Sequence, residues 1–303
     1  MFPRRLLRLK VFKILYAYYH NSNDSLYKFE EELKISLKKT YELFLFFLNL
    51  IIEIKNFEYE RLLLREKRLI KSNKKEDYSR NFIENKVIHL LEINNEFQKL
   101  KKEITLNILE HSEFFYKFNS KLWNYPNFIQ YLLIDKPKFN DDKKIVINIY
   151  EDIISQEEDL FQLLEDHNIH WSDDYEFCIS KCIENIKNFK LKNKNNNLLF
   201  PMFITESDKE FCPKLFKLTI NNKKENLNIL SKYVENWELN RISLLDRILL
   251  EMAITEFKYF YDIPKNVILD EYIEISKYYS TEKSHIFING VLDKIFEEEI
   301  KKN

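Results

Sequence analysis

The chain contains one glycine among its 303 residues, and this scarcity limits its possible folds more than any other feature. Glycine is the residue that most readily adopts positive φ, and many tight turns between strands depend on it. The six prolines supply few further turns. Sandwiches and barrels, which need many tight turns, are therefore disfavoured. Long helices joined by short polar segments are favoured.

Apolar periodicity supports an all-α fold. In residues 4–20, Leu7, Val11 and Leu15 repeat at helical spacing, and a second, longer helix is predicted from about residue 26 to beyond residue 54. Further helical patterns cover 82–100, 104–118, 127–134, 144–155, 157–166, 174–189, 208–220, 223–236, 243–260, 265–279 and 282–300. The polar runs 71–81 and 190–197 are predicted to be joints. Only "KIVINIY", residues 144–150, has a competing strand pattern.

Composition and charge narrow the class of protein. Apolar residues make up 45% of the chain, enough for a core, and the net charge of −1 excludes a globally basic nucleic-acid binder but not a local basic patch. Three cysteines are an odd, sparse set, which is typical of a reducing compartment. We see no signal peptide, and the most apolar run, residues 43–52, is too short to span a bilayer. We therefore expect a cytoplasmic protein.

The N-terminal segment is strongly basic. No acidic residue precedes Asp24, and the basic residues are Arg4, Arg5, Arg8, Lys10 and Lys13. Positive charge at the start of a helix opposes the helix dipole, so a purely structural sequence more often places Asp or Glu there. Two interpretations remain open: a solvated helix end with a chance basic bias, or a cluster that contacts phosphate.

Motifs at both ends resemble one known family, the NusB transcription antitermination factors. The N-terminal end resembles the family's Arg-Arg-x-x-Arg signature followed by Leu-Tyr, here "RRLLR" and "LY" at 15–16. The C-terminal end resembles its Asp-Arg helix in "DRILLEMAITE", its Ile-Pro helix from residue 263 and its last helix in "SHIFINGVLDK". The resemblance covers residues 4–20 and about 208–296. The string "SHIFINGVLDK" is its most specific part.

The resemblance implies a fold and a function. Family members are all-α, built from two packed helical subdomains, and bind boxA RNA of ribosomal RNA operons together with the ribosomal protein NusE. They assist RNA polymerase in reading through terminators. Carried over residue by residue, the resemblance implies RNA contacts at Arg4, Arg5, Arg8, Lys13, Lys283 and Phe287. It implies NusE contacts at Tyr16 and Glu256.

The sequence departs from the family in charge and in length. Lys13 stands where the family usually has Gln, and Lys283 where it often has an acid, so both changes add positive charge on the expected RNA side. Typical members are also much shorter. We therefore expect three parts: N-terminal NusB-like helices in 1–56, a helical insertion of unknown role in 57–207, and a C-terminal NusB-like subdomain in 208–303.

Gly290 lies in the last predicted helix, where glycine costs about 1 kcal/mol relative to alanine. We expect its missing Cβ to permit close approach by another backbone or a ligand, so that Gly290→Ala destabilises the protein. A purely structural role in packing is favoured over contact with RNA.

Other chemistry is weakly indicated. His167, His170, Cys178 and Cys182 are residue types that zinc accepts, but their spacing matches no standard finger, and buried structural cysteine is the favoured interpretation. One glycine cannot build a Gly-rich phosphate loop, and no nucleophile elbow or HExxH motif is present. We expect no catalysis, no cofactor and no metal. The alternative function is a protein-binding helical scaffold that acts through the insertion.

Overall fold

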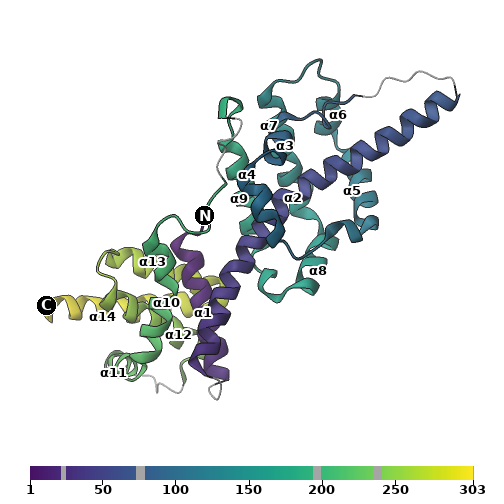
Figure 1. The fold of residues 1–303 in the computed structure, drawn as a ribbon. Coiled ribbons are helices and arrows are strands. Elements are labelled where there is room, and N and C mark those ends of the chain that lie inside the picture. Colours follow the sequence, from purple (N-terminus) through teal and green to yellow (C-terminus); the bar gives the residue numbers. More distant parts are fainter. Residues whose placement is uncertain (22–24, 73–78, 194–198, 235–240, 303) are drawn as a thin grey trace. The chain divides into compact units, whose positions relative to one another are not determined.

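A computed structural model describes residues 1–21, 25–72, 79–193, 199–234 and 241–302 (Figure 1). Within these ranges the chain forms fourteen α-helices and five short 3-10 turns, and no residue there lies in a β-strand. The all-α prediction is therefore confirmed. The rival strand at 144–150 lies inside helix α7 (Phe139–Asp152). The predicted joints 71–81 and 190–197 lie partly outside the described residues.

The chain divides into two compact units. The terminal unit comprises Met1–Leu37 and Met202–Asn303, and the inserted unit comprises Lys38–Pro201. These boundaries differ from the predicted division at 56/57 and 207/208. The first boundary falls inside α2 (Leu26–Ser72), a helix that continues unbroken on both sides of it. A continuous helix gives no local sequence signal at residue 37, so the periodicity could not reveal this boundary.

The terminal unit is organised around α12 (Leu244–Tyr259). This helix packs against α1 (Arg4–His20), α10 (Glu206–Asn221), α11 (Lys223–Tyr233), α13 (Lys265–Tyr279) and α14 (Ser284–Lys302). Every residue of α12 from 248 to 256 is buried. A helix that is buried all round must be surrounded by other elements, and α12 fits that description.

Local signals explain where the helices of this unit begin. Pro3 precedes α1 in an extended conformation, and its fixed φ suits the entry to a helix. Thr205 caps α10, because its hydroxyl accepts a hydrogen bond from the Asp208 backbone amide while the Asp208 carboxylate accepts one from the Thr205 amide. Ser243 caps α12 by a single hydrogen bond, which its hydroxyl accepts from the backbone amide of Asp246.

The inserted unit is organised around the middle of α2. Residues 40–54 of α2 are all buried, and Tyr150 and Cys178 of later helices donate hydrogen bonds to its backbone carbonyls. The later helices of the unit are labelled in Figure 1. They are α3 (Lys86–Glu92), α4 (Asn95–Leu100), α5 (Ser112–Asn124), α6 (Pro126–Leu132), α7, α8 (Glu158–His167) and α9 (Tyr175–Asn188). No helix in the described ranges combines the length and apolar character that a membrane span requires.

Candidate binding surface on the first and last helices

Arg8 and Glu256 form a buried ion pair. Arg8 is 1% exposed and Glu256 is fully buried. Arg8 Nε donates to Glu256 Oε2 at 2.9 Å, and its Nη2 donates to Oε1 at 2.5 Å. The hydroxyl of Tyr272 donates to the same carboxylate at 2.8 Å. Burial alone would lower the pKa of Arg8, but the hydrogen bonds and charge of Glu256 outweigh burial and raise it.

This arrangement changes how two predicted surface residues are understood. The family resemblance implied an RNA contact at Arg8 and a NusE contact at Glu256, whereas the structure places both side chains in the interior. The reason is chemical: a bidentate arginine–carboxylate pair satisfies both charges, so the two side chains can be buried together. The pair joins α1 to α12 and holds α1 in place.

Arg4 and Arg5 lie at the surface and are also paired with acids. Arg4 Nε donates to Asp208 at 2.6 Å, and its side chain is 28% exposed. Arg5 donates two hydrogen bonds of 3.0 Å to Glu271 and is 52% exposed. The hydrogen bonds with Glu271 raise the pKa of Arg5. Both guanidinium groups can be reached from solvent, but each already has a carboxylate partner.

Further along α1, two predicted residues are accessible. Lys13 is half-buried, and its Nζ lies 5.5 Å from the centroid of the Tyr279 ring. Tyr16 is 39% exposed, and its ring centroid lies 4.5 Å from that of His20. Lys13 is therefore placed against α13, while Tyr16 presents an aromatic surface that a partner could contact.

At the start of α14, Lys283 is exposed and Phe287 is half-buried. Lys283 ends a short turn between α13 and α14 that is fixed by hydroxyl contacts. Ser280 and Ser284 have hydroxyl oxygens 3.0 Å apart, and both hydroxyls donate to the carboxylate of Asp246. The turn that carries Lys283 is thus anchored to α12.

Gly290 corrects a prediction. It lies in α14 as expected, but it is exposed, its φ is not positive, and an added Cβ would meet no atom within 4 Å. The expectation of close packing at Gly290 is wrong. The buried face of α14 is instead formed by Ile288, Leu292 and Ile295, and position 290 points the other way.

The sequence did not single out the acids that pair with the arginines of α1. Asp208, Glu271 and Glu256 come from three different helices, α10, α13 and α12. Glu256 was noticed, but only through the family resemblance. The absence of any acid before Asp24 was a usable signal, because an uncompensated basic helix start calls for acids supplied from elsewhere in the fold.

In the inserted unit, the cysteines favoured as structural are indeed buried. The thiols of Cys178 and Cys182 donate to the carbonyls of Thr40 and Phe44, at 3.4 and 3.5 Å. His167 stacks on Trp171, with ring centroids 5.1 Å apart. Over the described ranges, no group of three or more His, Cys, Asp or Glu side chains is arranged to hold a metal ion.

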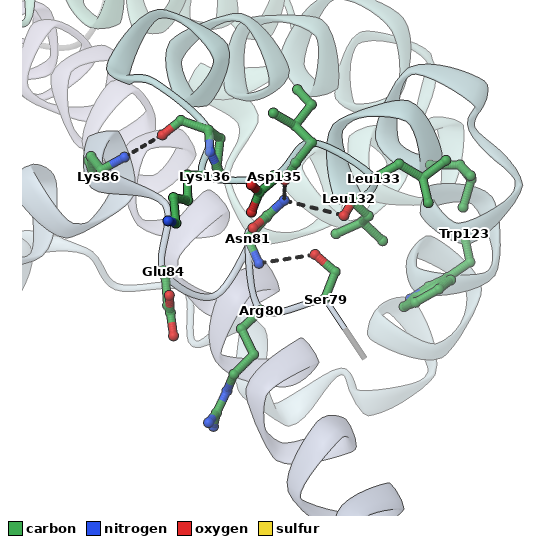
Figure 2. A pocket seen from close by; sticks show the side chains of 13 residues that line it. Ser79, Arg80, Asn81, Glu84, Lys86, Trp123, Leu132, Leu133, Asp135 and Lys136 are labelled. Atoms are coloured by element: carbon green, nitrogen blue, oxygen red, sulfur yellow. Dashed lines mark hydrogen bonds between the residues drawn. The ribbon is translucent and has the colours of Figure 1, made fainter. Parts of the chain in front are cut away.

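The inserted unit also contains a surface hollow of about 800 Å³ (Figure 2). Its lining includes Arg80, Trp123 and the exposed Leu133. Figure 2 shows the amide of Asn81 directed at the backbone beside the hollow, where it donates to the Ile134 carbonyl at 2.8 Å. None of the residues predicted to bind RNA or a partner lines this hollow.

The fold and this surface define an all-helical protein with paired arginines on its first helix and a fixed turn before its last helix. Residues 180–297 match the NusB family, so the chain contains a NusB family domain. The match begins within α9, includes α10–α13 and ends within α14, whereas α1 lies outside it.

Relatives named transcription antitermination protein NusB match part of the chain. The Salinibacter ruber protein is 43% identical over 95 residues, which is 31% of this chain and 59% of the relative. The Chloroherpeton thalassium protein is 41% identical over 90 residues, 30% of this chain and 43% of the relative. The Thermotoga maritima protein is 46% identical over 87 residues, 27% of this chain and 61% of the relative. The matches thus span less than two thirds of these relatives.

Among solved structures, T. maritima NusB is similar at 26% identity with a TM-score of 0.30, over 55% of this chain and 94% of that chain.

Proposed function

We propose that this protein is an RNA-binding transcription antitermination factor without catalytic activity, acting in the cytoplasm on ribosomal RNA operons. Its partners would be boxA-type single-stranded RNA, the ribosomal protein NusE and the antitermination complex of RNA polymerase. The observation that carries the proposal is the NusB family match over α10–α14, beside which α1 presents Arg4, Arg5 and Lys13.

RNA binding at α1 would require an RNA phosphate to replace the carboxylate that is already paired with an arginine. Arg5 is the most exposed of the three paired arginines, and its partner Glu271 is 18% exposed. A phosphate that approaches Arg5 must share the guanidinium with this carboxylate or displace it. Because phosphate and carboxylate carry similar charge, the net gain in binding free energy is smaller than for an unpaired arginine. Arg8 would act by holding α1 in place rather than by touching RNA.

At the other side of this surface, Lys283 and Phe287 would complete the RNA contacts. Lys283 is exposed and stands on a turn fixed to Asp246, so its backbone position is defined. Phe287 is half-buried, so only part of its ring could contact a base. Tyr16, exposed further along α1, would contact NusE. Glu256 would support that surface from the interior.

The test is a binding titration with fluorescein-labelled boxA-type RNA, with and without NusE, at several salt concentrations. Arg5→Ala should weaken binding, and Glu271→Gln should strengthen it, because it frees the guanidinium from a competing charge. Lys283→Ala should lower the salt slope by about 0.7, the value for one phosphate contact on a single strand. Lys232→Ala, an exposed lysine on α11, is the matched control.

Absence of RNA binding by the folded wild-type protein, alone and with NusE, would overturn the proposal. It would favour the alternative, a protein-binding helical scaffold acting through the inserted unit. One observation supports that alternative: Leu133, on the rim of the hollow in Figure 2, is 80% exposed. Weaker binding by Glu271→Gln than by wild type would instead refute only the replacement of the carboxylate by phosphate.

A further inference from the structure

Helices α1 and α13 lie side by side and run in the same direction. Near their starts, Arg5 is paired with Glu271. Eight residues later on each helix, Lys13 lies 5.5 Å from the ring of Tyr279. Because both contacts advance by the same number of residues along both helices, the chain directions are parallel. The contacts from Arg5–Glu271 to Lys13–Tyr279 thus form one continuous line between the two helices, called the seam below.

Tyr278 lies at the end of this seam. On an α-helix, positions 271, 274 and 278 fall on one stripe. Glu271 binds Arg5, and the charge of Glu274 also acts on Arg5, so this stripe faces the N-terminal part of α1. Tyr278 is therefore the last member of the stripe that borders α1. Its neighbour Tyr279 contacts Phe12 of α1, with ring centroids 6.0 Å apart.

The ring of Tyr278 takes no part in packing. It is 81% exposed, and among the described residues it has no aromatic partner and its hydroxyl has no hydrogen bond. In contrast, the buried ring of Tyr272, on the same helix, packs in the core and bonds Glu256. A large ring left in water contributes little to stability, so the fold itself gives no reason for an aromatic residue at 278.

One basic side chain contacts the residue after Tyr278, and another follows Tyr278 by five residues in the sequence. Lys13 lies against Tyr279, the residue that follows Tyr278. Lys283 lies beyond the short turn that begins at Ser280 and is fixed to α12 by Asp246. Single-stranded nucleic acid binds where exposed aromatic rings occur among basic residues, because bases stack on the rings while phosphates contact the cations.

We propose that Tyr278 is a stacking site for one unpaired nucleobase of the bound RNA, with the flanking phosphates directed toward Lys13 and Lys283. This inference rests on the proposed RNA-binding function and adds a contact to it. A protein partner could also cover an exposed tyrosine; the nearby basic residues Lys13 and Lys283 favour a polyanion. Stacking tolerates any base, so Tyr278 would add affinity without selecting sequence.

The experiment compares wild type with Tyr278→Ala and Tyr278→Phe in the RNA titration. The matched control is Tyr261→Ala, a tyrosine that is 88% exposed in the joint before α13, at the opposite end of that helix. Tyr278→Ala should weaken RNA binding about fivefold to a hundredfold and leave the salt slope unchanged, because no phosphate contact is lost. Tyr278→Phe should bind like wild type. Circular dichroism checks that each variant is folded.

A second series of titrations identifies which nucleobase of the RNA stacks on Tyr278. The RNA probe is made with an abasic sugar at each position in turn. One position should weaken wild-type binding yet have little further effect on Tyr278→Ala, because the stacking partner is already gone. Wild-type RNA binding together with an unchanged affinity of Tyr278→Ala would overturn this inference and leave the proposed function intact. Loss of NusE binding without loss of RNA binding would likewise overturn it, and would assign Tyr278 to a protein contact. No RNA binding by wild type would overturn both.

Discussion

The buried pair between Arg8 and Glu256 yields the sharpest test of the structure. Glu256→Gln keeps the shape of the side chain but removes its charge. One acceptor oxygen then remains for three donor groups, Nε and Nη2 of Arg8 and the hydroxyl of Tyr272. The Arg8 charge stays 1% exposed, and its next carboxylate is Glu271, 3.5 Å from Nη1.

Removing one partner of a buried pair typically destabilises a protein by about 3–5 kcal/mol. The contact with Glu271 offsets part of this loss for Glu256→Gln, so we expect a value near the lower end, about 3 kcal/mol. With an m-value of about 2 kcal/mol/M in urea, the midpoint of the terminal unit should fall by about 1.5 M.

The assay is urea unfolding followed by circular dichroism, on Glu256→Gln, Arg8→Met and the double variant. The double variant should lose less stability than the sum of the single variants, because it leaves no unpaired buried charge. Additive losses, or a single-variant loss below about 1 kcal/mol, which is typical of a solvent-exposed pair, would refute the buried pair. In folded Arg8→Met, the salt slope of RNA binding should equal that of wild type.

Two further predictions concern single positions in the terminal unit. Gly290→Ala should stabilise the protein by about 0.5–1 kcal/mol, since alanine favours the helix and its Cβ meets open space; a lower melting temperature would contradict this. Burial alone would raise the pKa of Asp208, but hydrogen bonds from Thr205 and Arg4 outweigh it and lower the pKa below its usual 3.8. Its stabilisation is therefore present above pH 3.8 and lost as pH falls through the lower folded value. Asp208→Asn should show a shallower loss of stability between pH 5 and pH 2 than wild type, and equal acid sensitivity in urea melts would refute the assignment.

Helix boundaries were predictable wherever a strong apolar repeat coincided with a clear start. The predicted ranges 4–20 and 265–279 coincide with α1 and α13. The range 82–100 was predicted as one helix but contains α3 and α4. Asn94 separates them, because its side chain accepts from the amide of Phe97 and starts a new helix. An asparagine in the middle of an apolar repeat does not reveal from sequence alone whether it caps.

The candidate surface was less predictable, because its chemistry depends on distant partners. Arg8 and Glu256 are 248 residues apart in sequence, and only the fold shows that they neutralise each other. The exposed position of Gly290, by contrast, could have been predicted from the sequence. Ile288, Leu292 and Ile295 define the buried side of α14, and helical periodicity places position 290 opposite it.

The scarcity of positive-φ backbone has a consequence for the unfolded chain. Lys136 alone among the described non-glycine residues has positive φ, and the single glycine lies in a helix. An average chain of this length has about 20 glycines. Replacing a glycine by alanine where the fold tolerates it stabilises by about 0.4–1 kcal/mol through the entropy of the unfolded state. Summed over about 20 glycine positions, this entropic stabilisation is about 8–20 kcal/mol, comparable with the whole free energy of unfolding of a typical protein. Folding of this chain therefore begins from a stiffer ensemble, and fewer backbone conformations are lost when its helices form.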